Sequence, residues 1–156
     1  LAYDRPIHAQ WAADGEPDFE LLWATADDCG MKIGGQPVHF VRCVLEIPVH
    51  AADRPFGYGV WTTLSAENHK RYMETFDATD QASLGRMFGY LANRLPAYPD
   101  TLNLKADVVP RDNRQRPLVE LWDEGDHPLV RDQREGLDAG QLEALLSRIL
   151  PCDGRA

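Results

Sequence analysis

The densest group of polar side chains in the sequence lies in the segment NRLPAYPD, residues 93–100. Its members that can form hydrogen bonds or ion pairs are Asn93, Arg94, Tyr98 and Asp100. Two prolines restrict the backbone here, so the loop loses less entropy when it is held in one conformation, as a binding site requires. A structural loop benefits in the same way, and Arg94 paired with Asp100 would simply tie its ends together. Both interpretations stay open.

A second group consists of Glu120, Asp126 and His127. An imidazole close to two carboxylates can act as a general base near neutral pH. The alternative is that Asp126 caps a short helix and His127 lies in its exposed first turn. Together with residues 93–100, these side chains form the candidate pocket.

The sequence predicts no metal and no cofactor. Its five histidines show no His-x-x-x-His spacing, and Cys29, Cys43 and Cys152 include no Cys-x-x-Cys pair. The cysteines are therefore expected to be reduced thiols in the cytoplasm. No serine stands in a nucleophile-elbow motif, and no glycine run forms a phosphate loop. These patterns leave open whether the chain is an enzyme.

The formal net charge of −9 and the pI near 4.9 disfavour binding to nucleic acid, which needs a concentrated basic surface. An acidic surface attracts basic partners, although acidity also serves solubility alone. No apolar run approaches the length of a membrane span, and Asp4, Arg5 and Pro6 interrupt the start where a signal peptide would be apolar. We therefore expect no membrane association and a cytoplasmic location.

Two hairpins are predicted from alternating or β-branched segments. Residues 39–49 form the first strand, and residues 56–64, which alternate in side-chain type, form its partner. Residues 102–109 and 118–122 form a second hairpin with a longer loop. An exposed tryptophan on the face of a strand would mark a contact surface, so Tyr58 and Trp61 are the candidate interface residues.

Helices are indicated after Ser65, which is placed as an N-cap, and after Asp138, which forms a capping box with Gln141. The second helix is expected to end at Pro151 and to bury four apolar side chains against the sheet: Leu142, Leu145, Leu146 and Ile149. Residues 79–95 match both helical and strand patterns, so their type stays open.

Four segments together resemble a known family: LEIPV (45–49), GVWTTLSAENHKRY (59–72), FGYLANRLPAYPDTLNLK (88–105) and DHPLVRDQREG (126–136). Their order and spacing are similar to those of DUF2199, an uncharacterised bacterial family, from about residue 20 to the C-terminus. Members commonly begin with a Cys-x-x-Cys-Gly segment that looks like half of a zinc site, and this chain has none. The resemblance therefore implies a fold but neither a metal role nor catalytic residues.

We expect a single domain over residues 1–156, with an N-terminal arm at 1–19 and a core at 20–150. Its predicted class is α+β, with an antiparallel or mixed sheet of about five strands against two or three helices. The favoured function is an acidic protein-interaction module that captures a basic partner, such as a toxin-neutralising immunity-type protein. The alternative is a small-molecule-binding protein or enzyme whose pocket is lined by Arg94, Tyr98, Glu120 and His127.

Overall fold

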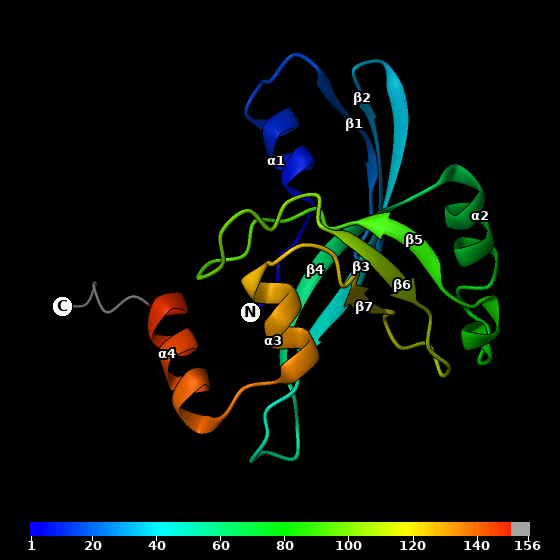
Figure 1. The fold of residues 1–156 in the computed structure, drawn as a ribbon. Coiled ribbons are helices and arrows are strands. Elements are labelled where there is room, and N and C mark those ends of the chain that lie inside the picture. The colour runs from blue at the N-terminus through cyan, green and yellow to red at the C-terminus, as the bar shows by residue number, and fades with distance from the viewer. Residues whose placement is uncertain (151–156) are drawn as a thin grey trace.

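A computed structural model describes residues 1–150 and shows a mixed seven-stranded sheet with four α-helices and one 3₁₀ helix (Figure 1). The predicted α+β class is confirmed, with more strands than the five expected. The elements in chain order are α1 (Ile7–Ala13), β1 (Phe19–Ala24), β2 (Asp28–Ile33), β3 (Gln36–Ile47), β4 (Phe56–Leu64), α2 (Ala66–Glu74), η1 (Gln81–Leu84), β5 (Met87–Tyr90), β6 (Lys105–Val109), β7 (Leu118–Leu121), α3 (Pro128–Glu135) and α4 (Ala139–Ile149).

The 12-residue strand β3 organises the sheet, whose order is β1-β2-β3-β7-β6-β5 with β4 on the other side of β3. Strand β4 pairs antiparallel with β3 from His39 opposite Leu64 to Ile47 opposite Phe56, which is the first predicted hairpin. Strand β7 joins β3 in parallel, and the remaining pairs are antiparallel. An isolated bridge between Thr62 and Leu91 brings the chain after β5 back onto β4, so the sheet curls around its core.

Residues 79–95, whose type the sequence left open, form the short helix η1 followed by β5. In β5 the residues Met87 and Gly89 are buried, and their neighbours Phe88 and Tyr90 face solvent. Gly89 has to be a glycine because an added Cβ would lie 2.1 Å from the carbonyl oxygen of Thr63. This close approach of two backbones lets the short strand β5 pack directly on β4.

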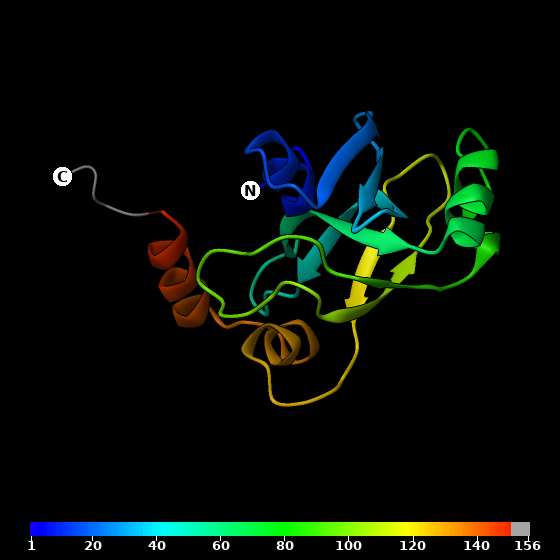
Figure 2. The ribbon, with the colours of Figure 1, turned by 90° about the horizontal axis from the view of Figure 1, so that it is seen from above.

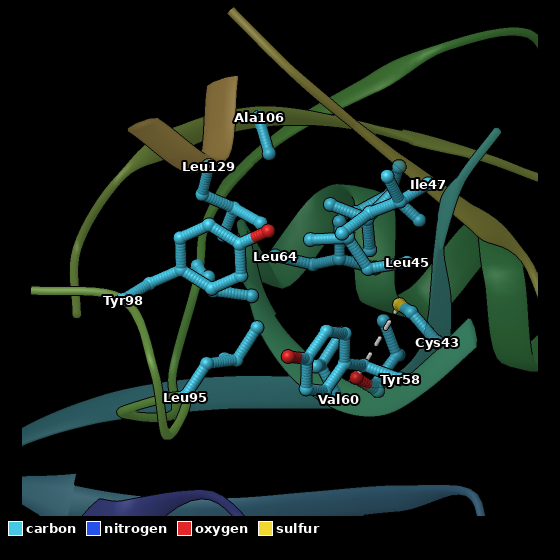
Figure 3. Packing of buried hydrophobic residues seen from close by; sticks show 14 of the residues in the cluster. Cys43, Leu45, Ile47, Tyr58, Val60, Leu64, Leu95, Tyr98, Ala106 and Leu129 are labelled. Carbon is cyan, nitrogen blue, oxygen red and sulfur yellow. Dashed lines mark hydrogen bonds between the residues drawn. The ribbon is translucent and has the colours of Figure 1, made fainter. Parts of the chain in front are cut away.

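The main core lies inside the curled sheet and is closed by residues from the helices and from the loop after β5. Figure 3 shows Tyr58 and Val60 of β4 packed near Leu95, Tyr98 and Leu129. All five side chains are buried. In β3, four fully buried residues alternate with half-buried ones and form the face toward this core: Val41, Cys43, Leu45 and Ile47. Phe40 is buried in a second cluster.

The N-terminal residues pack against the sheet. Ala2 makes a bridge to Gly59 of β4, and the amide of Ile7 donates to the carbonyl of Ala92 at 2.9 Å. Helix α1 lies beside β1, where Ala9 joins a second buried cluster with Phe40 and other residues (Figure 2). Within residues 1–150, no helix has the length and apolar character needed to cross a membrane.

Two predicted helix starts are confirmed, and a third is corrected. Ser65 accepts a hydrogen bond from the amide of Asn68 at 3.1 Å, and the Asp138 capping box with Gln141 is present. The third helix, α3, is capped by His127, whose Nδ1 accepts from the amide of Leu129, rather than by Asp126.

The C-terminal helix α4 lies farthest from the sheet (Figures 1 and 2). Of the four side chains predicted to be buried, only Leu145 is, at 1% exposed; the other three are half-buried. The reason is that α4 covers the edge of the core rather than the face of the sheet. Pro151 and Cys152 lie outside the described residues.

Candidate functional site

Asn93 and Arg94 line a hollow between the N-terminal residues and the segment after β5. Asn93 is buried, and its Oδ1 accepts from the amide of Trp61 at 2.7 Å. The guanidinium group of Arg94 lies over the ring of Trp11, 5.5 Å from the centroid, and Arg94 forms no ion pair with Asp100. Arg94 therefore does not join the ends of the loop by pairing with Asp100.

Tyr98 and His127 lie at a different place, where the loop after β5 meets α3. Tyr98 is buried and donates from its hydroxyl to Asp132 at 2.6 Å. Burial, followed by the hydrogen bond to Asp132, raises the pKa of this tyrosine well above its usual range. The Nε2 of His127 lies 2.6 Å from the carbonyl oxygen of Pro99, and its other nitrogen caps α3. With both nitrogens engaged in this way, His127 has a structural role.

The remaining predicted pocket residues are exposed. Glu120, on β7, contacts Arg86; Asp126 forms an ion pair with Arg131 at 3.3 Å; and Asp100 occupies a left-handed backbone position with φ 49°. The predicted pocket residues thus make their contacts in separate parts of the fold.

The two candidate interface residues are both buried, Tyr58 at 0% and Trp61 at 1% exposed. Trp61 donates from its indole nitrogen to the carbonyl of Tyr3 at 2.9 Å, and Tyr58 stands in the main core. A contact surface made of these two side chains does not exist in this fold. The reason is that β4 is an interior strand, covered on one side by the core and on the other by the N-terminal residues.

An unanticipated polar cluster lies where α2 meets β1, β2 and β3. Asp28 accepts hydrogen bonds from Thr25, Trp23 and the Nε2 of His69, at 2.6, 2.9 and 3.0 Å. Burial opposes ionisation of Asp28, yet these donors outweigh it and lower the pKa of the carboxyl group. The His39 ring stacks on His69, with centroids 4.6 Å apart.

This cluster fastens α2 to the β1–β2 hairpin. His69 lies on α2, and its hydrogen bond to Asp28 joins this helix to β2. The indole of Trp23 lies against Gly30, where an added Cβ would be 2.1 Å from the ring. Within the described part of the chain, no group of three or more His, Cys, Asp or Glu side chains is arranged to hold a metal ion.

The two described cysteines are buried and free. Burial raises the pKa of Cys29 to about 11 and that of Cys43 to about 12. Thiolates are the reactive form of cysteine, so neither thiol is activated as a nucleophile.

The outer face of β5, β6 and β7 carries a cluster of exposed aromatic side chains, the aromatic patch, which consists of Phe88, Tyr90 and Trp122. Their exposed fractions are 36%, 40% and 38%. Phe88 is the central ring, with centroids 5.0 Å from Tyr90 and 4.9 Å from Trp122 in edge-on contacts. Such edge-on pairs are favourable beyond the area that they bury.

Strand pairing sets the neighbours of the aromatic patch. Phe88 is paired with Asp107, and Tyr90 with Lys105, across β5 and β6. Trp122 donates from its indole nitrogen to Asp107 at 3.0 Å, and its ring lies 5.7 Å from the ammonium group of Lys105. These contacts hold the large indole in one position, while more than a third of each of the three side chains stays exposed to solvent.

Sequence reasoning missed the aromatic patch because residues 79–95 had no assigned type. Once β5 is known to be a strand, the alternation in MFGY places Phe88 and Tyr90 on one face. Trp122, more than 30 positions further on, reaches them only because β6 lies between β5 and β7. No local pattern carries that information.

Fold and surface together define a small α+β protein with a curled mixed sheet and one exposed aromatic face. Residues 1–137 match the family model described as an uncharacterised protein conserved in bacteria, DUF2199. The chain belongs to this family. The match begins at residue 1 rather than near residue 20, and it ends before α4. No curated protein and no solved structure matches the chain.

Proposed function

We propose that the chain is a protein-interaction module that captures a basic partner through the aromatic patch. The observation that carries the proposal is the set of three exposed aromatic rings in mutual contact on one sheet face. Tryptophan and tyrosine are enriched among the residues that dominate binding energies at protein interfaces. Soluble proteins rarely leave such side chains clustered at the surface without a partner.

Charged side chains lie beside the aromatic patch. Asp107 and Lys105 are the cross-strand partners of Phe88 and Tyr90, and Arg86 contacts both Asp107 and Glu120. The whole chain carries a formal charge of −9. A basic partner would be steered toward such a surface, and its aliphatic and guanidinium groups suit aromatic faces. A toxin-neutralising immunity-type protein would be one member of this class.

The alternative, a small-molecule pocket lined by Arg94, Tyr98, Glu120 and His127, has less support. Tyr98 and His127 are engaged with Asp132 and the carbonyl of Pro99, while Glu120 contacts Arg86 on the far side of β6. Four side chains that contact different elements are poorly placed to grip one ligand.

The proposal is tested by comparative capture from a lysate of the source cell. The baits are the wild-type chain, the Phe88→Ser/Trp122→Ser variant, and a control variant, Leu21→Ser/Leu22→Ser. The control removes two leucines of β1 that are also exposed, at 43% and 44%. We expect a basic protein that is retained by the wild type and the control but lost with the variant of the aromatic patch.

The second step measures the kinetics with the captured protein. Attraction between exposed charges is screened beyond about 8 Å at physiological salt, so the association rate constant should fall steeply as salt rises. Retention of the same proteins by all three baits, or an association rate that is independent of salt, contradicts the proposal.

A further inference from the structure

A hollow of about 580 Å³ lies between the N-terminal residues and the segment that follows β5. Its apolar lining comes from Pro6, Ile7 and Ala13, and its polar lining includes two arginines, Arg5 and Arg94. The hollow is separate from the aromatic patch, none of whose three residues lines it. Its volume is in the range of small-molecule sites in proteins.

The walls that carry the two arginines are fixed by a reciprocal pair of hydrogen bonds. Tyr3 donates from its hydroxyl to the carbonyl of Arg94 at 3.0 Å, and Asn93 donates from its amide to the carbonyl of Arg5 at 3.0 Å. The backbone carbonyl of each arginine is therefore bound by a residue that lies close in sequence to the other arginine: Asn93 precedes Arg94, and Tyr3 lies two positions before Arg5. Asn93 is itself buried, so the backbone at both positions is well fixed while the guanidinium groups stay exposed.

Neither guanidinium group forms an ion pair within residues 1–150. Arg94 lies against Trp11, which supports its aliphatic part without neutralising its charge. Among residues 1–150, Asp4 is the only carboxylate that lines the hollow. In a chain with a net charge of −9, two unpaired arginines at one hollow are a local excess of positive charge.

We propose that this hollow binds a small organic anion, with its oxyanion group held by Arg5 and Arg94 and its apolar body against Pro6 and Ile7. Guanidinium groups form paired, charge-assisted hydrogen bonds with carboxylate and phosphate oxygens, which are the two chemistries that fit. The site is independent of the aromatic patch. A bound anion would also link the N-terminal residues to the segment after β5.

The test is a titration of the isotopically labelled chain followed by amide NMR shifts, with benzoate, phenyl phosphate and the neutral benzamide at constant ionic strength. We expect saturable shifts at residues 3–13 and 93–94 for at least one of the two anions. Tighter binding of phenyl phosphate assigns a phosphate ligand, and tighter binding of benzoate a carboxylate. Benzamide should bind much more weakly.

Variants connect the binding to the two guanidinium groups. Arg5→Gln and Arg94→Gln should each weaken anion binding roughly tenfold or more, whereas Arg94→Lys should retain more of the affinity. Arg131→Gln, which removes an exposed arginine of α3, is the control and should leave the affinity unchanged. Equal binding of benzamide, no saturable shift with either anion, or an unchanged affinity in both glutamine variants would overturn the proposal.

Discussion

A single buried amide, that of Asn93, connects three segments of the chain. It accepts from the amide of Trp61, donates to the carbonyl of Arg5, and its backbone carbonyl accepts from Thr101 at 2.9 Å. The sequence indicated Asn93 as a binding residue because of its polar neighbours. The structure shows that its side chain is engaged by the protein itself, which no count of polar residues along the chain reveals.

Replacement of Asn93 by alanine should therefore destabilise the fold. The backbone amide of Trp61 would lose its acceptor in a buried place, which costs about 1–3 kcal/mol of unfolding free energy. Urea unfolding of Asn93→Ala measures the loss, with the exposed Gln115→Ala as control. An Asn93→Ala variant as stable as the wild type would show that this hydrogen bond contributes nothing to stability.

Two half-buried histidines, His8 and His39, predict sensitivity to acid. His8 packs against Phe40 and Trp11, and burial lowers its pKa to about 4. Burial, followed by repulsion from His69, also lowers the pKa of His39. Since an unfolded histidine titrates near 6.5, the unfolded state binds more protons below that pH. The contribution of these two histidines to stability should be constant above about pH 6.5, and stability should fall as the pH drops from there toward 4.

The measurement is the unfolding free energy at pH 7 and at pH 5 for the wild type, His8→Phe and the exposed-histidine control His50→Gln. The His8→Phe variant should lose less stability between the two pH values, because phenylalanine binds no proton in the folded or the unfolded state. An equal loss in the wild type and His8→Phe would show that protonation of His8 does not cause the loss of stability in acid.

Among the secondary-structure elements, the sequence predicted best those features that depend on residues close together in the chain. The first hairpin, the Ser65 cap and the Asp138 capping box follow from local alternation and local hydrogen bonds, and all three are present. The strand at residues 87–90 and the shallow burial of α4 depend on which distant segment lies alongside. A glycine that touches the backbone of β4 looks like any other glycine in the sequence.

Two adjacent leucines of helix α4 should contribute differently to the unfolding free energy. Leu145 is buried at 1% exposed, whereas Leu146 is half-buried. Leu145→Ala should lower the unfolding free energy by about 2–5 kcal/mol through lost burial and a residual cavity, and Leu146→Ala by clearly less. Thermal or urea unfolding of both variants provides the comparison. A larger loss for Leu146→Ala would mean that the helix packs through a different side than the structure shows.

At the scale of the whole molecule, the curled sheet decides what is exposed. The bridge from Leu91 to Thr62 turns the inner faces of β5, β6 and β7 onto β4, and the outer faces remain uncovered. Tyr58 is thereby buried in the main core, whereas Trp61 is covered by the N-terminal residues on the opposite face of β4. Phe88, Tyr90 and Trp122 are left at the surface. The candidate interface could not be located from the sequence because it depends on this long-range closure.

The most direct measurement is the dissociation constant of the captured basic partner for the wild type and for Trp122→Ala, with the exposed Trp23→Ala as control. Because Trp122 is held in place by Asp107 at the edge of the aromatic patch, its removal should cost the binding energy of an interface hot spot. We predict an increase of about 30-fold in the dissociation constant for Trp122→Ala, mostly through faster dissociation, and little change for Trp23→Ala. A dissociation constant for Trp122→Ala within about twofold of the wild-type value would contradict binding through this surface.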